Sequence, residues 1–171
     1  MTLEELNALP DQQAIEIYHG CCHCQRWARQ MALSRPFEST EMLLERADEL
    51  WAQATHGEIL EAFQGHARIG DMEALKARYS GATGDEQGQV LQTSEAVIRE
   101  LYELNLEYER RHGFIFIVCA SGKSAEEMLE LLKARIDNST GHEMINGARE
   151  QGAITRLRLH KLVSETEVNN E

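Results

Sequence analysis

The densest group of reactive side chains is the segment His19-Gly20-Cys21-Cys22-His23-Cys24, which offers five potential zinc ligands in six residues. A structural zinc site usually combines two separated ligand pairs, and no second Cys/His pair has the spacing to complete a tetrahedron. The fourth cysteine, Cys119, lies in an apolar run, where a thiol is typical of a small buried hydrophobe. We therefore interpret the segment as structural. A metal-dependent hydrolase that uses it is a competing hypothesis, which elemental analysis of the purified protein would test.

A second short motif, Gly122-Lys123-Ser124, resembles the end of a phosphate-binding loop. Ile117 occupies the position where such a loop needs its first glycine. We therefore interpret the motif as a turn, with Ser124 as the N-cap of the next helix.

Three further polar side chains could form a site, although each has an ordinary structural explanation. His66 follows Gly65, which predicts a helix end, so the imidazole would lie in a loop, where it can exchange protons near neutral pH. Glu86 falls in the first turn of a long predicted helix, where a carboxylate interacts favourably with the helix dipole. Arg158 lies near the apolar stripe of the last predicted helix, where it either extends its charge to water or holds an anion. The residues alone indicate a candidate His/Glu/Arg site but no reaction.

These side chains must be positioned by helices, because apolar residues recur every three or four positions and no stretch alternates as a strand would. The predicted fold class is all-α, a single-domain helical bundle of about eight or nine helices. Thr2 with Glu5 and Thr140 with Glu143 have the spacing of capping boxes, which would begin the first and last helices. The helix from Asp85 to Arg111 is predicted to be the longest. The others are expected at about 11–33, 40–51, 59–64, 71–79, 124–136 and 140–162.

The most apolar run, from His112 to Ser124, is the only one rich in β-branched and aromatic residues. It is too short to span a bilayer. We expect it to be fully buried, whether extended or helical, and to form the spine of the core around which the helices pack.

The chain has 171 residues and a formal net charge of -12. This length predicts one domain, residues 1–165, followed by a polar C-terminal tail, residues 166–171. Nucleic acid is not expected as a partner, because no basic cluster longer than Arg110-Arg111 occurs. Three of the four cysteines are crowded together, which does not form a disulfide framework, and the N-terminal segment is acidic rather than signal-like. We therefore expect a cytoplasmic protein with no membrane partner.

Six short segments are informative in combination. In order, they are Arg35-Pro36-Phe37, His66-Ala67-Arg68-Ile69-Gly70, Glu86-Gln87, Asn105-x-x-Tyr108, Gly113-Phe114-Ile115-Phe116-Ile117-Val118-Cys119-Ala120 and Arg156-Leu157-Arg158-Leu159. Together they resemble the OHCU decarboxylase family, where OHCU is 2-oxo-4-hydroxy-4-carboxy-5-ureidoimidazoline. The resemblance extends from about residue 3 to residue 163, and its most specific parts are the His-x-Arg-Ile-Gly loop and the Gly-Phe-x-Phe-x-Val-Cys-Ala run.

The resemblance implies an all-helical homodimer that uses neither cofactor nor metal and converts OHCU to (S)-allantoin, the last step from urate. It implies that His66, Glu86 and Arg158 are catalytic. It also implies that two segments frame this small ureidoimidazoline substrate, one around the catalytic glutamate and one in the apolar run. The implied substrate-binding residues are Ala67, Thr83, Gly84, Asp85, Gln87, Phe116, Ile117, Val118 and Cys119.

The implied chemistry suits a site without a cofactor. The carboxylate of OHCU lies on a carbon next to a C=N bond, which can take up the electron pair left by departing CO₂. The protein has to orient the carboxylate, stabilise charge on the ring and deliver one proton to a single face. Arg158 suits planar hydrogen bonding to carboxylate or imide oxygens, and His66 can exchange a proton. Glu86 can hold the ureido N–H groups or orient His66, so either residue could handle the proton.

Three residues depart from the family pattern. Ala67 replaces the usual proline and leaves the loop backbone freer. Thr83 replaces the usual serine but keeps a hydroxyl, and His112 precedes Gly113 where phenylalanine is frequent. None of the three is an implied catalytic residue.

The alternative from another functional class is a non-catalytic, acidic helical interaction module, for which amphipathic helices would suffice. This alternative does not require His66, Glu86 and Arg158 to lie together. A decarboxylase requires them to converge.

Overall fold

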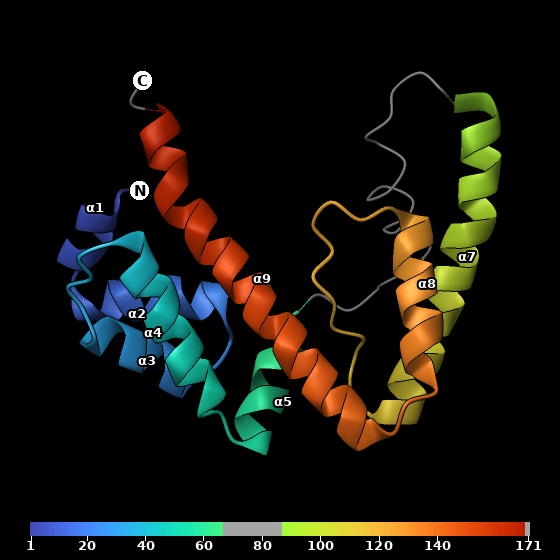
Figure 1. The fold of residues 1–171 in the computed structure, drawn as a ribbon, viewed down its shortest axis with the longest axis horizontal. Coiled ribbons are helices and arrows are strands. Elements are labelled where there is room, and N and C mark those ends of the chain that lie inside the picture. Colours follow the sequence, from blue (N-terminus) through green and yellow to red (C-terminus); the bar gives the residue numbers. More distant parts are fainter. Residues whose placement is uncertain (67–86, 170–171) are drawn as a thin grey trace. The chain divides into compact units, whose positions relative to one another are not determined.

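The computed structural model describes the backbone of residues 1–66 and 87–169 and the side chains of residues 1–66 and 95–164. All regular secondary structure in these ranges is helical, which confirms the predicted all-α class (Figure 1). The described helices are α1 (Leu3–Ala8), α2 (Asp11–Cys21), α3 (Gln25–Leu33), α4 (Thr40–Ala52), α5 (His56–Gln64), α7 (Gln87–His112), α8 (Ala125–Ile136) and α9 (Thr140–Asn169). The helix expected at 71–79 lies outside the described residues. None of the described helices is long and apolar enough to cross a membrane.

The chain divides into two compact units. The terminal unit comprises Met1–His66 and Ala148–Glu171, and the central unit comprises Ala67–Gly147. Helix α9 begins in the central unit and ends in the terminal unit, so it contributes side chains to both. The limits of a domain at 1–165 and a tail at 166–171 stay predictions, while α9 itself continues to Asn169.

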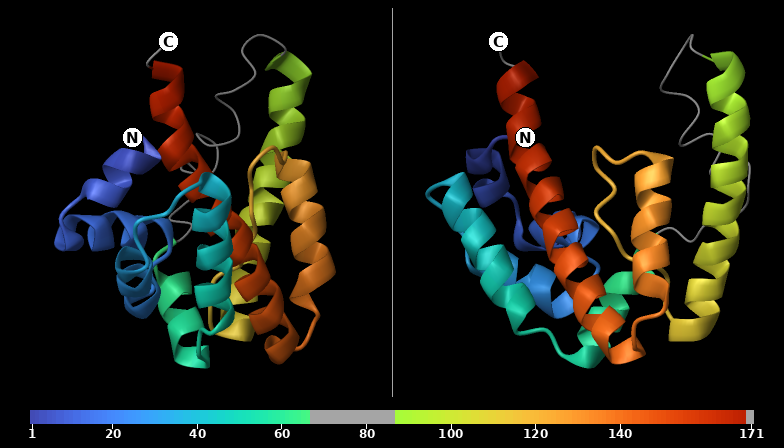
Figure 2. Two further views of the ribbon diagram at one scale, coloured as in Figure 1. Left: turned by 60° about the vertical axis from the view of Figure 1, so that its left-hand side comes forward. Right: turned by 45° about the vertical axis from the view of Figure 1, so that its right-hand side comes forward.

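In the terminal unit, helices α1 to α5 pack with the C-terminal part of α9 around one apolar core (Figure 2). Tyr18 on α2 and Trp27 on α3 are fully buried in it, and their rings meet edge to face with centroids 6.2 Å apart. The Nε1 atom of Trp27 donates a hydrogen bond to the carbonyl of Ala47 on α4 at 3.0 Å. Burial of these two rings therefore holds α2, α3 and α4 together without leaving the indole N–H unsatisfied.

Local capping fixes where several helices begin and end, as the sequence predicts. Thr2 and Glu5 form the expected capping box at α1, and Ser124 caps α8 as expected. At α4 the cap is Ser39, one residue before the expected start of the helix. Gly65 is the C-cap of α5. These signals depend on neighbouring residues only, which is why they are visible before the fold is known.

The predicted continuous helix at 11–33 is wrong, because the chain leaves the helical conformation between Cys21 and Gln25. Cys22 and Cys24 adopt extended backbone angles, and the amide of Cys22 closes α2 on the carbonyl of Tyr18. On one uninterrupted helix, the three cysteine side chains would spread over a wider arc than a single apolar stripe. The break allows all three to be buried in the core.

In the central unit, α7 and α8 pack against each other around a smaller core that includes the buried side chains of Leu101, Tyr108 and Leu132. After His112, which is buried at the end of α7, the apolar run is irregular, and among residues 113–124 only Ile117 is buried. The prediction that this run is the fully buried spine of the fold is therefore wrong. Its alternate residues, Phe114, Phe116, Val118 and Ala120, pack against the α7–α8 core while partly exposed. An extended segment that packs on one side of a small helical pair leaves its other side less covered.

The helix predicted to be longest is shorter than α9, which has 30 residues against 26 for α7. Helix α7 ends at His112, and Gly113 follows with φ of 82°. This left-handed conformation favours glycine and turns the chain out of the helix.

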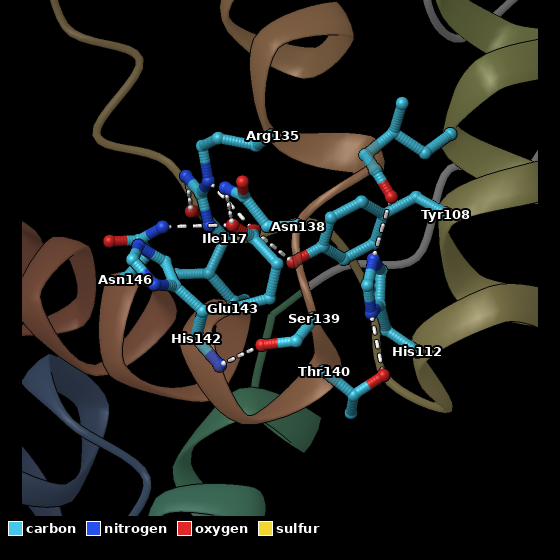
Figure 3. A network of polar contacts seen from close by, with 11 residues as sticks. Tyr108, His112, Ile117, Arg135, Asn138, Ser139, Thr140, His142, Glu143 and Asn146 are labelled. Carbon is cyan, nitrogen blue, oxygen red and sulfur yellow. Dashed lines mark hydrogen bonds and ion pairs between the residues drawn. The ribbon is translucent and has the colours of Figure 1, made fainter.

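The predicted capping box of Thr140 and Glu143 is also wrong, although α9 does begin at Thr140. The hydroxyl of Ser139 accepts the hydrogen bond from the amide of His142 and so caps the helix. The Thr140 hydroxyl instead lies 2.9 Å from Nδ1 of His112. The Glu143 side chain turns inward and is completely buried (Figure 3).

The carboxylate of Glu143 is the centre of a polar network in the central unit (Figure 3). It accepts hydrogen bonds from Tyr108 Oη at 2.6 Å, Arg135 Nε at 2.8 Å, Asn138 Nδ2 at 2.9 Å and Asn146 Nδ2 at 2.8 Å. Burial raises the pKa of this carboxyl, but the hydrogen bonds and the charge of Arg135 outweigh burial and leave the pKa below its ordinary value. A buried carboxylate is thus paired and hydrogen-bonded rather than isolated.

Candidate functional site

His66 is positioned by α5 and by its contact with α9. Its amide donates to the carbonyl of Phe63 at 3.2 Å, directly after the C-cap Gly65. Helix α5 is in turn tied to α3, because Arg26 pairs with Glu58 at 2.9 Å. The half-buried imidazole of His66 then meets α9, where its Nε2 lies 2.5 Å from Oε1 of Gln151.

A chain of hydrogen bonds connects His66 to Arg158 within the terminal unit. The side chains of Gln151 and Thr155 are buried on one face of α9, four residues apart. Gln151 Nε2 donates to Thr155 Oγ1 at 3.0 Å, and Thr155 Oγ1 donates to the carbonyl of Cys21 at 3.5 Å. Arg158 Nη1 donates to the same carbonyl at 3.2 Å. The carbonyl that α2 leaves unpaired at its end is therefore the meeting point of both side chains.

Arg158 supplies the positive charge of the site. It is half-buried and makes no ion pair with any residue of the described ranges. A guanidinium that has a neutral carbonyl as its described acceptor can still bind an anionic group of a ligand.

The histidines of the site are held in the neutral form. Burial, and also the charge of Arg158, lower the pKa of His66, and the hydrogen bond to Gln151 opposes them only in part. Burial is also the main cause that lowers the pKa of His23, with His19, Arg158 and His66 adding to it. An uncharged imidazole beside a cation can accept a proton from a bound ligand at neutral pH.

His23 lies against Gly65, the residue before His66. A Cβ atom placed on Gly65 would be 2.2 Å from Cγ of His23, closer than any real contact. A glycine is therefore required at this point for the two imidazoles of His23 and His66 to lie on neighbouring segments.

The three cysteines of the segment from His19 to Cys24 are buried in the terminal unit. Burial raises the pKa of Cys21 to about 11 and that of Cys22 to about 12, so both are thiols near neutral pH. Among the described residues, no three His, Cys, Asp or Glu side chains are arranged to hold a metal ion.

Two residues of the site were missed in the sequence. Gln151 and Thr155 were treated as part of an ordinary helix face, because neither residue type is reactive alone. Their spacing relative to Arg158 could have identified them. Positions 151, 155 and 158 are separated by four and then three residues, so they lie on one helix face, which also carries Leu159. Polar side chains at that spacing on an apolar stripe indicate a buried polar function.

The apolar run carries four of the expected substrate-binding residues, Phe116 to Cys119, within the central unit. Arg135 fixes it at two points, because Nη1 donates to the Ile117 carbonyl at 2.8 Å and the guanidinium lies 4.5 Å from the centroid of the Phe116 ring. Lys123 Nζ donates to the Cys119 carbonyl at 2.8 Å. The side chains of Arg135 on α8 and of Lys123 in the turn before α8 thus hold the backbone of the run.

The remaining predicted residues are not described. Ala67, Thr83, Gly84, Asp85 and Glu86 lie outside the described residues, and Gln87 is described only as the first residue of α7. The structure therefore brings together His66 and Arg158 of the expected catalytic three. This convergence is what the interaction-module alternative did not require.

The all-helical fold thus holds the His66 imidazole and the Arg158 guanidinium on one hydrogen-bonded network, and these are the kinds of side chain that acid–base chemistry on a small anionic molecule would need. Comparison with known proteins identifies the family. The sequence model of the family described as OHCU decarboxylase matches residues 7–160. The chain belongs to the OHCU decarboxylase family.

Two relatives and two solved structures illustrate the similarity. The uric acid degradation bifunctional protein TTL of Arabidopsis thaliana is 36% identical over 148 residues, which cover 85% of this chain and 46% of that protein. The 2-oxo-4-hydroxy-4-carboxy-5-ureidoimidazoline decarboxylase of Haloferax volcanii is 24% identical over 93% of this chain and 94% of that protein. A crystal structure of OHCU decarboxylase in the presence of (S)-allantoin is 32% identical, with a TM-score of 0.71 over 91% of this chain and 99% of that one.

The other structure, an (S)-allantoin synthase, is 16% identical with a TM-score of 0.70 over 94% of this chain and 53% of that one, and it shows the fold alone. The chain spans less than half the length of two curated relatives that it matches, 46% of one and 34% of another.

Proposed function

We propose that this protein decarboxylates OHCU to (S)-allantoin in urate breakdown, without a cofactor. The observation that carries the proposal is the hydrogen-bonded connection from His66 through Gln151, Thr155 and the Cys21 carbonyl to Arg158. Family membership supplies the reaction, and the relative of known structure that is 32% identical was crystallised in the presence of the proposed product.

The reaction needs little more than orientation and proton transfer. The bond between the ring carbon and the carboxylate breaks, CO₂ leaves, and the electron pair forms a C=C bond while the neighbouring C=N electrons move to nitrogen, which takes up a proton. The resulting enol loses its hydroxyl proton and gains one on the adjacent carbon, which gives allantoin. One proton is consumed overall for each CO₂ released.

The side chains of the site fit these steps. Arg158 is proposed to bind the carboxylate or an imide oxygen, and His66 to take and return the proton. Glu86 is proposed as the third catalytic residue on the strength of the family pattern. Proposed contacts to the ring and the ureido group come from Ala67, Thr83, Gly84, Asp85, Gln87 and the run from Phe116 to Cys119.

A homodimer and a cytoplasmic location belong to the same proposal. Exposed large apolar side chains, among them Leu33 at 72% and Met42 at 47% on the terminal unit, support self-association. Light scattering that gave a monomer mass at micromolar concentrations would contradict the dimer. The four thiols, all unbridged, support a reducing compartment, which fractionation of the native cells would test.

Freshly generated OHCU is the substrate for the deciding experiment, with the chirality of the allantoin formed followed by circular dichroism. We expect an excess of (S)-allantoin from the wild type and a racemate, equal to spontaneous decay, from His66→Ala. Loss of a general acid or base typically costs about 10²–10⁴-fold in rate. His66→Asn keeps a hydrogen bond but not proton transfer, so near-full turnover by that variant would remove the proton role from His66. A racemate from the folded wild type would overturn the function itself.

A further inference from the structure

We propose that Gln151 is a positioning residue: its amide holds His66 in the tautomer with hydrogen on Nε2 and leaves Nδ1 as the nitrogen that exchanges a proton with the substrate. The catalytic half of this proposal rests on the proposed function. The tautomer half does not, because it concerns the protein without ligand.

The direction of the hydrogen bonds follows from one fixed acceptor. The Cys21 carbonyl can only accept, so the Thr155 hydroxyl donates its one hydrogen to it. The oxygen of that hydroxyl is then left to accept from Gln151, which must present its NH₂ group. The other end of the same amide, Oε1, therefore faces His66. A carbonyl oxygen cannot donate, so the hydrogen in the contact belongs to Nε2 of His66.

If these hydrogen bonds ran in the opposite direction, the buried polar groups would have fewer hydrogen bonds. If Gln151 were flipped, Thr155 would have to donate to the amide oxygen, and the Cys21 carbonyl would lose one of its two donors. Gln151 has no exposed surface and Thr155 only 3%, so water does not readily replace a bond lost between them. The arrangement with oxygen toward His66 keeps every one of these bonds.

The neutral state makes the tautomer important. The guanidinium of Arg158 and the burial of the ring disfavour a second proton on His66, so the resting imidazole carries one hydrogen only. With that hydrogen committed to Gln151, Nδ1 keeps its lone pair, and no residue of the described ranges forms a hydrogen bond with it. Nδ1 can take the hydroxyl proton of the enol and return a proton to the adjacent carbon, so that His66 ends each turnover neutral.

Gln151 is too deeply buried to be a substrate ligand, which separates its role from that of His66. When His66 is transiently protonated, the bond from Nε2 to Oε1 persists and stabilises the cation. In other enzymes, too, a buried hydrogen-bond acceptor orients an imidazole that itself transfers the proton.

The first test is nitrogen NMR of ¹⁵N-labelled wild-type protein at neutral pH, in which the His66 signals are assigned by their loss in His66→Asn. We expect a protonated Nε2 and an unprotonated Nδ1. The opposite pattern, or an equal mixture of tautomers, would overturn the proposal whether or not the protein is active.

The second test uses matched variants. Gln151→Met has similar length but no acceptor, and Thr155→Val keeps the shape but frees the amide to flip. Both should give mixed tautomers and lower kcat at least about tenfold, with KM changed less than about twofold. Thr155→Ser keeps the hydroxyl and should match the wild type. Gln151→Glu keeps an acceptor, so it should retain the tautomer and stereoselective turnover while its acidic pH limb moves to higher pH.

The outcomes separate the two proposals. A wild type with the expected tautomer but no stereoselective decarboxylation contradicts the proposed function and leaves the tautomer standing. Unchanged kcat in a folded Gln151→Met with mixed tautomers overturns the positioning role. If Gln151→Met does not fold, Thr155→Val and the wild-type spectrum decide.

Discussion

His66 shares its surroundings with the cation of Arg158 and with a second imidazole, that of His23. His19 and Glu61 are the other titratable groups that act on this pair, the first opposing and the second favouring a charge on His23. The net direction for both His66 and His23 is a pKa below the ordinary value, caused mainly by burial. An imidazole whose pKa is lowered in this way is a ready base but a poorly populated acid at neutral pH.

This direction predicts how stability depends on pH. The unfolded chain has ordinary histidines, with pKa about 6.5, so it binds protons before the folded protein does. The free energy of unfolding should therefore fall as the pH drops through about 6.5 toward the lower folded-state pKa values, and these residues should cause no loss at higher pH. Urea unfolding at several pH values checks this. Replacement of His23 and His66 by asparagine should flatten the slope, and an unchanged slope would contradict the assignment.

Gly65→Ala should be destabilising although it replaces a glycine by a better helix former. The new Cβ would lie 2.2 Å from the Cγ atom of His23, so the ring must move. Overpacking of this kind costs about 1–3 kcal/mol. Gly57→Ala on the same helix is the control, because nothing lies within 4 Å of its Cβ and the change should be neutral or stabilising. Equal effects of the two substitutions in thermal unfolding would refute the close approach.

At the scale of helices, the sequence predicted what neighbours alone decide. Ser124 caps α8 and Gly65 ends α5 as predicted, because caps act within four residues. The break after Cys21 and the inward turn of Glu143 could not be predicted in this way, since each involves a partner far along the chain, Thr155 for Cys21 and Tyr108 for Glu143.

In the candidate site, too, some residues could be recognised from the sequence, whereas others are important only through distant partners. His66 and Arg158 were predicted from residue type and family pattern, and in the structure Gln151, Thr155 and the Cys21 carbonyl connect them. Gln151 was missed because its importance comes from what it bonds to, which spacing alone does not reveal. The apolar run was misjudged because a run of β-branched residues indicates burial but not which side is covered.

The Glu143 network predicts a large effect from a small substitution. All four partners of the carboxylate are donors, namely Tyr108, Arg135, Asn138 and Asn146. Glu143→Gln would turn an amide NH₂ toward them and leave Arg135 without its buried counter-charge. We expect a loss of about 3–5 kcal/mol in urea unfolding. Glu126→Gln, at an exposed position of α8, should stay within about 0.5 kcal/mol, and a similarly small change at Glu143 would argue against a formed network.

At the scale of the whole molecule, the proposed reaction requires neither a metal ion nor a cofactor. The substrate carries its own electron sink, so stereoselective activity is expected to survive exhaustive treatment with EDTA. The measurement is allantoin chirality before and after chelation, with metal content determined in parallel. Activity that is lost on chelation and restored by zinc would favour the metal-dependent hydrolase hypothesis instead.

The break at Cys21–Cys24 has one more consequence, for the reactivity of the protein. Its three thiols are buried, and burial raises their pKa, whereas Cys119 in the apolar run is half-buried. A thiol-specific reagent should therefore titrate one equivalent quickly and three more only as the terminal unit opens. The number of thiols that have reacted would therefore report how far the terminal unit has unfolded. Because Cys119 is also a proposed substrate contact, slower reaction of the fast equivalent in the presence of allantoin would measure occupancy of the site without any assay of turnover.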